Sequence, residues 1–203
     1  MYEHEAIKEA EKAFANHIPS YHTCADIAVL DWYNKDGSAF YAVRYVFDGE
    51  NLYISGDLGN AVLTLTEKAT IDNIAKYQVN YFVNQIVCST DSYDFDIDIA
   101  EQEVRDYIYG TIENSYDDWD CLDEDADYNI EMFIYELIEE SKFLDGLCLN
   151  QRAKGFLRKI KKIGDFSEFD FEDFGKTVSK RVIFWLVGIK MAQKKLGEKR
   201  LIE

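Results

Sequence analysis

Proline and glycine are scarce in this 203-residue chain, which contains one proline, Pro19, and 11 glycines. Flexible linkers between domains are rich in these residues, so nothing in the composition indicates tethered domains. We expect residues 1–203 to form a single domain. The alternative is two packed lobes, with a helix and a sheet in 1–90 and acidic helices in 91–203.

Long apolar runs are also missing, because the longest one, at 182–189, has eight residues. A membrane-spanning helix needs about 20 apolar residues. The first residues of the chain, MYEHEAIKEAEK, are charged and lack the apolar stretch of a secretory signal. These absences predict a cytoplasmic protein that does not bind a membrane.

The patterns of common catalytic and metal sites are absent as well. The four cysteines have no CxxC spacing, the three histidines have no HExxH spacing, and no glycine-rich phosphate loop occurs. Registers starting at Asp94 and Asp123 resemble a calcium loop but lack its glycine and its final glutamate. We therefore expect no catalytic residue, no metal and no cofactor. Two alternatives stay open: zinc ligation by His22 and Cys24, and an enzyme that uses a pair of the 39 acidic residues.

Strand-like patterns follow a short N-terminal helix that we expect at 2–17, before Pro19. Turn sequences such as NKDGS and DGEN separate four apolar runs, at 28–33, 39–47, 52–56 and 61–65. These runs predict an antiparallel sheet of three to four strands. The second run has apolar residues on both faces, so we expect a central strand that is covered on both sides.

Helical spacing of apolar residues dominates the rest of the chain. The expected helices are 71–86, 98–114, 128–144, 151–163 and 175–196. Asp98 with Glu101 resembles the capping box of the second of these. The predicted fold class is therefore α+β, with an N-terminal helix, an antiparallel sheet and a mostly helical C-terminal half.

Negative charge is concentrated in one segment. Residues 91–127 contain 15 acidic residues and one basic residue, Arg105, which gives −14 of the chain's net charge of −17. Charge runs are often only solvated surface. Here tyrosines and a tryptophan are interleaved with the acids, a composition that favours a protein interface. The candidate partner-binding residues are Asp94, Asp96, Asp117, Asp118, Trp119, Asp120, Asp123, Glu124, Asp125 and Asp127.

Two further segments have a biased composition. The sequence DFSEFDFEDF at 165–174 alternates acids with phenylalanines, and it is either a core-docking element or a second partner-binding patch. The candidate residues of this patch are Phe169, Asp170, Phe171 and Glu172. Residues 152–162 contain six basic residues and no acid. We interpret them as an internal counterweight to the acidic segment or as a patch for an acidic partner.

Two stretches of the chain resemble small proteins of phages and prophages of Gram-positive bacteria. They are DGSAFYAVRYVFDGENLYISGDLGNAV at 36–62 and YFVNQIVCSTDSYDFD at 81–96. The shared pattern is a strand that ends in Ser-Gly-Asp, then an aromatic helix, a Cys-Ser step and a run of Tyr and Asp. Small acidic phage proteins of this kind resemble counter-defence factors, including anti-CRISPR inhibitors of Cas9. The resemblance therefore implies an inhibitor that binds Cas9 or its guide-RNA complex in the cytoplasm of a bacterial host.

Charge and resemblance together predict a non-enzymatic inhibitor from a mobile element that binds a basic nucleic-acid-handling protein. An enzyme with a carboxylate site and a phage assembly or scaffold protein are the alternatives. The net charge of −17 also predicts that the chain does not bind free DNA or RNA, because it repels phosphate.

Overall fold

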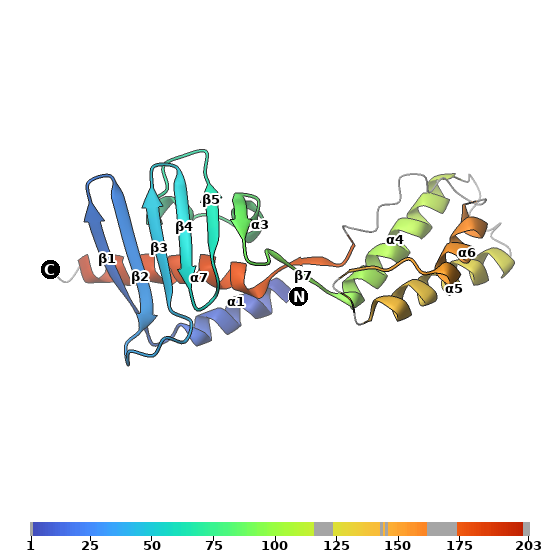
Figure 1. Cartoon of the computed structure of the whole chain (residues 1–203), viewed down its shortest axis with the longest axis horizontal. Coiled ribbons are helices and arrows are strands. Elements are labelled where there is room, and N and C mark those ends of the chain that lie inside the picture. Colours follow the sequence, from blue (N-terminus) through green and yellow to red (C-terminus); the bar gives the residue numbers. More distant parts are fainter. Residues whose placement is uncertain (1, 116–123, 143, 145, 162–173, 201–203) are drawn as a thin grey trace. The chain divides into compact units, whose positions relative to one another are not determined.

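The structure, a computed structural model, describes residues 2–115, 124–142, 144, 146–161 and 174–200 (Figure 1). The chain divides into two compact units. The scaffold unit consists of Met1–Tyr93 and Val178–Glu203, and the inserted unit is the intervening segment, Asp94–Thr177. The last helix thus belongs to the scaffold unit, and the division differs from the expected lobes 1–90 and 91–203.

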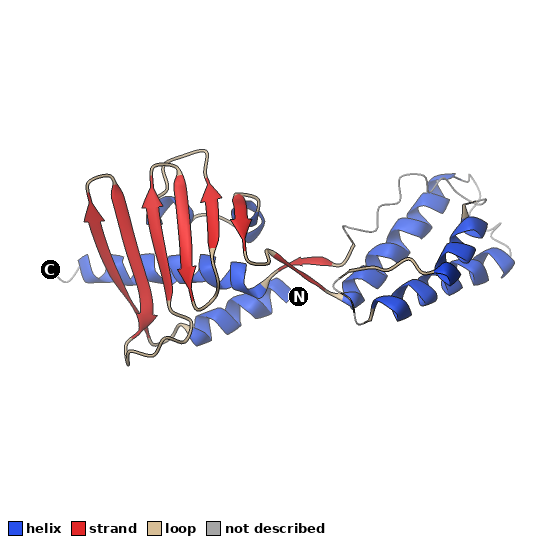
Figure 2. Ribbon diagram, viewed as in Figure 1, coloured by secondary structure: helices blue, strands red, loops and turns tan. Residues whose placement is uncertain are grey.

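Six antiparallel strands form the sheet of the scaffold unit, in the order β1-β2-β3-β4-β5-β6 (Figure 2). They are β1 (His17–Cys24), β2 (Ile27–Asn34), β3 (Val43–Asp48), β4 (Asn51–Gly56), β5 (Ala61–Thr64) and β6 (Ile86–Ser89). The α+β class is confirmed, but the sheet has six strands instead of the expected three to four. The four predicted runs correspond to β2 to β5.

The two additional strands lie at the edges of the sheet. β1 contains Pro19, which was expected only to end the N-terminal helix. An edge strand tolerates proline because one of its sides has no ladder hydrogen bonds to lose. β6 arises from the segment 71–86, where a single helix was expected. That segment instead forms two short helices, α2 (Ile71–Ile74) and α3 (Val79–Val83), before β6 begins.

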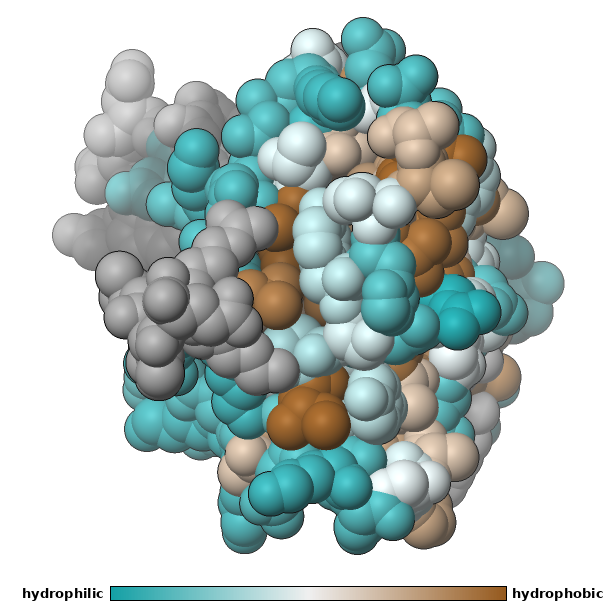
Figure 3. All heavy atoms as spheres, turned by 90° about the vertical axis from the view of Figure 1, so that its left-hand side faces the viewer, coloured by the Kyte–Doolittle hydropathy of each residue, from teal (hydrophilic) through white to brown (hydrophobic). Residues whose placement is uncertain are grey.

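The β1 edge of the sheet lies at the end of the scaffold unit that Figure 3 shows. Apolar side chains on this end form small separate patches among polar ones. Proline and a mostly polar surface both discourage edge-to-edge pairing with another chain.

Two long helices, α1 (Tyr2–Ala13) and α7 (Lys180–Arg200), lie on the same face of the sheet (Figure 2). Val43, Tyr45 and Phe47 of β3 point to this face and are buried. Arg44, from the opposite face, is exposed and forms an ion pair with Asp31 at 2.6 Å. The expectation that β3 is covered on both sides is therefore wrong, because an antiparallel sheet can leave one face open to water.

The apolar run at 182–189 lies in α7, where nearly every side chain is buried in the core of the scaffold unit. Packing against the sheet explains this run. Among the residues that the structure describes, no helix combines the length and the apolar character that crossing a membrane requires.

His17 is a buried polar residue in the scaffold core. Its ring lies 5.0 Å from the Phe14 ring and 5.6 Å from the Trp32 ring, measured between centroids. In the described part of the chain, neither ring nitrogen has a hydrogen-bond partner. Burial lowers the pKa of His17 below its ordinary value of 6.5. The backbone groups of Phe40 and Tyr41 raise this pKa, but their effect is smaller than that of burial.

This burial predicts that the free energy of unfolding decreases as the pH is lowered. Below pH 6.5 the unfolded chain protonates His17 while the folded chain resists, so the free energy of unfolding decreases until the folded pKa is reached. The loss is at most about 1.4 kcal/mol per pH unit. Denaturant unfolding of the wild type and of His17→Phe across this pH range isolates the contribution. His22→Phe, at an exposed position, is the control. A difference between wild type and His17→Phe that does not change with pH would contradict the account.

Within its described residues, the inserted unit has a hydrophobic core of its own, made by three helices. They are α4 (Ile97–Ser115), α5 (Glu124–Ser141) and α6 (Gln151–Ile160), close to the expected ranges. The core contains Val104, Ile108, Ile112, Ile130, Phe133, Ile134, Leu137, Ile138, Ala153 and Ile160. Two strands, β7 (Tyr93–Phe95) and β8 (Lys176–Val178), pair with each other where the chain enters and leaves this unit. The helix expected at 175–196 therefore begins later, after β8.

Candidate protein-interaction surface

The inserted unit carries nearly all of the net charge. Residues 94–177 contain 24 acidic and 9 basic residues, a net charge of −15. The scaffold unit contains 15 acidic and 13 basic residues, a net charge of −2. Apart from Asp91, the charge that the sequence concentrates at 91–127 thus belongs to a unit that folds around a separate core.

Several of the sequence-predicted residues lie outside the described residues. They are Asp117, Asp118, Trp119, Asp120 and Asp123 in the acidic segment, and Phe169, Asp170, Phe171 and Glu172 in the phenylalanine-rich segment. Their assignment to a partner surface stays a prediction.

Asp94 and Asp96 lie where the chain enters the inserted unit. Asp94 is exposed on β7, and its backbone carbonyl accepts a hydrogen bond from Thr177 Oγ1 at 3.2 Å. Asp96 Oδ1 accepts hydrogen bonds from the backbone N–H groups of Asp98, at 3.0 Å, and Ile99, at 3.2 Å. Asp96 therefore caps α4, two residues before the expected cap at Asp98. Part of the acidic pattern thus has a structural role.

Glu124, Asp125 and Asp127 occupy the first turn of α5. Negative charge is favourable there because the free N–H groups of a helix start carry partial positive charge. Asp127 Oδ1 also lies 3.1 Å from the hydroxyl of Tyr109 on α4. The carboxylates of Glu124 and Asp125 are exposed and have no hydrogen bond or ion pair with another described residue. These two charges are available to a partner.

Arg105 joins α4 to α5 through a charged network. Its Nη1 lies 2.6 Å from Glu131 Oε1, and its Nη2 lies 3.0 Å from Glu101 Oε1. The Tyr109 hydroxyl lies 2.9 Å from the same oxygen of Glu131. The hydrogen bond from Arg105 lowers the pKa of the Glu131 carboxyl, whereas burial raises the pKa of Tyr109. A general acid at neutral pH needs a raised carboxyl pKa, so this network fits structural pairing better than acid catalysis.

Two tyrosines on α5 are mostly exposed to solvent. Tyr128 is 59% exposed and Tyr135 is 56% exposed. They are seven residues apart and therefore lie on one side of the helix, two turns from each other. Acids occupy the intervening and flanking positions of the same side, at steps of three or four residues. We call this set the α5 stripe: Glu124, Tyr128, Glu131, Tyr135 and Glu139.

The α5 stripe combines rings and carboxylates that suit a cationic partner. Tyrosine is among the residues that dominate binding energy at protein interfaces. Its ring face attracts arginine and lysine, and the Glu124 carboxylate can pair with the same groups, whereas Glu131 already pairs with Arg105 and Glu139 with Lys142. The sequence offered a signal for it in the spacing of these five residues. Only the boundaries and buried face of α5 show that Tyr128 and Tyr135 are exposed, and that Glu131 is instead half-buried beside Arg105 of α4.

The basic helix α6 packs against α5. Arg152 Nη1 lies 3.6 Å from Glu136 Oε1, and Lys159 Nζ donates to Asn129 Oδ1 at 3.0 Å. The Lys159 ammonium also lies 5.1 Å from the centroid of the Phe156 ring. Glu136 lies outside the acidic segment 91–127 and Asn129 is neutral, so the interpretation of 152–162 as a counterweight to that segment stays a prediction.

The histidine and cysteine proposed as zinc ligands lie at the end of β1. The His22 Nε2 atom is 2.8 Å from Ser20 Oγ, and Cys24 is an exposed free thiol. Among the residues described, no group of three or more His, Cys, Asp or Glu side chains is placed to hold a metal ion.

Comparison with known proteins identifies no relative. No family model matches the chain, and no curated protein or solved structure matches it.

Proposed function

We propose that the protein is a non-enzymatic inhibitor from a mobile element, which binds a basic nucleic-acid-handling protein through its inserted unit. The observation that carries the proposal is the unequal charge of the two units, −15 in the inserted unit and −2 in the scaffold unit. Charge concentrated on one compact unit creates a field that steers a cationic partner toward that unit.

The amount of charge suits competition with nucleic acid. Duplex DNA carries one negative charge per about 1.7 Å of its axis, so fifteen charges correspond to roughly seven base pairs. A channel lined with lysine and arginine would attract the inserted unit for the same reason that it attracts DNA. Occupation of that channel would block the substrate without any chemical step.

The α5 stripe supplies slow dissociation, which charge alone does not provide. Carboxylates accelerate encounter, but exposed ion pairs contribute little to lasting affinity. The rings of Tyr128 and Tyr135 can pack on the guanidinium groups and alkyl stems of a basic partner, which slows dissociation. We therefore assign the steering role to the acids and the anchoring role to the two tyrosines.

The resemblance to small acidic phage proteins favours Cas9 with its guide RNA as the partner. Cas9 holds its RNA–DNA heteroduplex in a positively charged channel, which is the kind of surface that this charge distribution fits.

Capture from a nuclease-treated bacterial lysate tests the proposal. The bait is the full chain, and the matched bait is its variant Tyr128→Ala/Tyr135→Ala. We expect the wild type to retain a nucleic-acid-binding protein at low salt, to release it at high salt, and to retain much more of it than the variant does. Equal recovery of the same proteins by both baits would contradict the proposal.

Cleavage of target DNA by purified Cas9 with guide RNA tests the specific partner. The chain should slow cleavage when it is added before the DNA and should have less effect when it is added afterwards. An unchanged rate in both orders would exclude that Cas9 as the target.

A further inference from the structure

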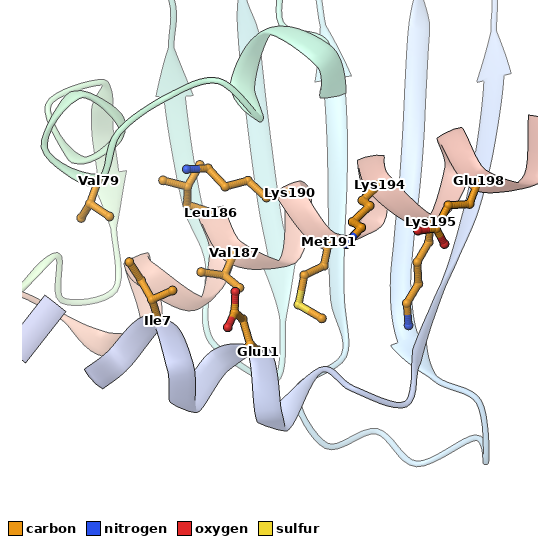
Figure 4. A pocket seen from close by; sticks show the side chains of 10 residues that line it. All are labelled: Ile7, Glu11, Val79, Leu186, Val187, Lys190, Met191, Lys194, Lys195 and Glu198. Atoms are coloured by element: carbon orange, nitrogen blue, oxygen red, sulfur yellow. The ribbon is translucent and has the colours of Figure 1, made fainter. Parts of the chain in front are cut away.

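A groove of about 420 Å³ runs along α7 in the scaffold unit, between α1 and α3 (Figure 4). Its apolar wall consists of Ile7, Val79, Leu186, Val187 and Met191. Val79, Leu186 and Val187 are buried residues of the scaffold core, so the groove gives access to the edge of that core. Small-molecule sites typically have volumes of about 300–1,000 Å³ and mostly apolar walls.

Lysines from α7 line the same groove. The Lys195 ammonium already serves the fold, because it donates to the backbone carbonyls of Ala15 and His17. Lys190 and Lys194, in contrast, form no hydrogen bond or ion pair with any other residue in the described ranges. Burial lowers the pKa of Lys190, since its ammonium is partly removed from water, and the charge of Glu3 opposes this shift only in part. Two exposed carboxylates, Glu11 and Glu198, complete the rim.

We propose that this groove binds a single-chain anionic amphiphile, an alkyl carboxylate whose tail lies on the apolar wall and whose head group pairs with Lys190 and Lys194. A cation that is partly desolvated and forms no ion pair or hydrogen bond, as Lys190 is here, gains most from an anion. The neighbouring apolar wall gains from an alkyl chain in the same molecule. The strongly negative inserted unit would repel such an anion, whereas the groove belongs to the nearly neutral scaffold unit.

The dimensions of the groove agree with a chain of medium length. Leu186 and Lys194 are eight residues apart on α7, which corresponds to about 12 Å along the helix axis. Met191 lies between them in the groove, as Figure 4 shows. Its unbranched thioether side chain can adapt to alkyl tails of different shape.

Titration calorimetry with dodecanoate, below its micelle concentration, tests the proposal on the full chain. We expect saturable binding of one molecule per chain. Dodecyltrimethylammonium has a tail of the same length and the opposite charge, so it should bind at least about tenfold more weakly. No saturable binding of dodecanoate, or equal binding of both amphiphiles, would overturn the proposal.

Two double variants distinguish binding by the groove lysines from a general effect of net charge. Lys190→Met/Lys194→Met keeps the alkyl stems and removes both ammonium groups, so dodecanoate affinity should fall about tenfold or more. Lys8→Met/Lys12→Met removes the same charge from exposed positions of α1 that do not line the groove, and affinity should change less than twofold. An equal loss in the two variants would show that only net charge matters. Unchanged affinity of Lys190→Met/Lys194→Met would show that these lysines do not bind the carboxylate of dodecanoate.

Discussion

The variant Tyr128→Ala/Tyr135→Ala is expected to dissociate from the basic partner about 100-fold faster than the wild type. Each tyrosine ring that anchors an interface contributes about 1.4 kcal/mol or more, which is a factor of ten in affinity. The unfolding temperature should stay the same, because both rings are more than half exposed and alanine favours a helix. Surface plasmon resonance measures the rate of dissociation, and circular dichroism measures the melting temperature.

The matched control is Tyr53→Ala, on the open face of the scaffold sheet. Tyr53 is 40% exposed, but it belongs to the unit with little net charge. Its removal should leave dissociation unchanged. If the double variant dissociates at the wild-type rate, or if Tyr53→Ala has the same effect, the α5 stripe is not the anchor.

The substitution Gly188→Ala is expected to lower the free energy of unfolding by about 2–3 kcal/mol. A Cβ atom at this position of α7 would lie 2.5 Å from the hydroxyl of Tyr45 and 3.3 Å from Trp32 Cδ1. The Tyr45 side chain is fully buried and cannot move freely, because its hydroxyl donates to the backbone carbonyl of Trp185 at 2.9 Å. The clash outweighs the gain of about 1 kcal/mol that alanine brings to a helix. Denaturant unfolding measures the change.

Two further variants identify the cause. Gly197→Ala lies in the same helix with no atom near the new methyl group, so it should be neutral or stabilise by up to about 1 kcal/mol. Combining Gly188→Ala with Tyr45→Phe removes the atom that the methyl group meets. The double variant should lose less free energy of unfolding than the sum of the losses in the two single variants. Strict additivity would mean that Tyr45 does not set the limit on residue 188.

Local patterns were sufficient to predict much of the fold. β2 to β5 follow alternating apolar residues between turn sequences, and α4 to α6 follow apolar residues at helical spacing. The edge strands were missed because proline in β1 and helix-compatible residues before β6 give misleading local signals. The return of α7 to the scaffold could not be predicted, because it depends on packing between residues that are far apart in sequence.

The charge of the candidate site could be predicted from the sequence, but its geometry could not. Counting acids located the excess at 91–127, but the count could not show that Asp96 caps a helix or that Glu131 pairs with Arg105. Tyr128 directly follows the acidic segment and Tyr135 lies seven residues further on, so the charge count singled out neither ring. Their common exposure depends on which face of α5 the core of the inserted unit covers.

The most direct test of the central claim is the association rate at different salt concentrations, measured with the captured partner. The variant Glu113→Gln/Glu124→Gln/Asp125→Asn removes three exposed charges from the inserted unit, and Glu5→Gln/Asp48→Asn/Glu50→Gln removes three from the scaffold unit. At low salt, the first variant should associate about tenfold more slowly than the wild type, and the second should associate almost as fast. The difference should vanish near 1 M salt, where charges act over only about 3 Å. Equal rates for the two variants at low salt would contradict the claim that the inserted unit steers binding.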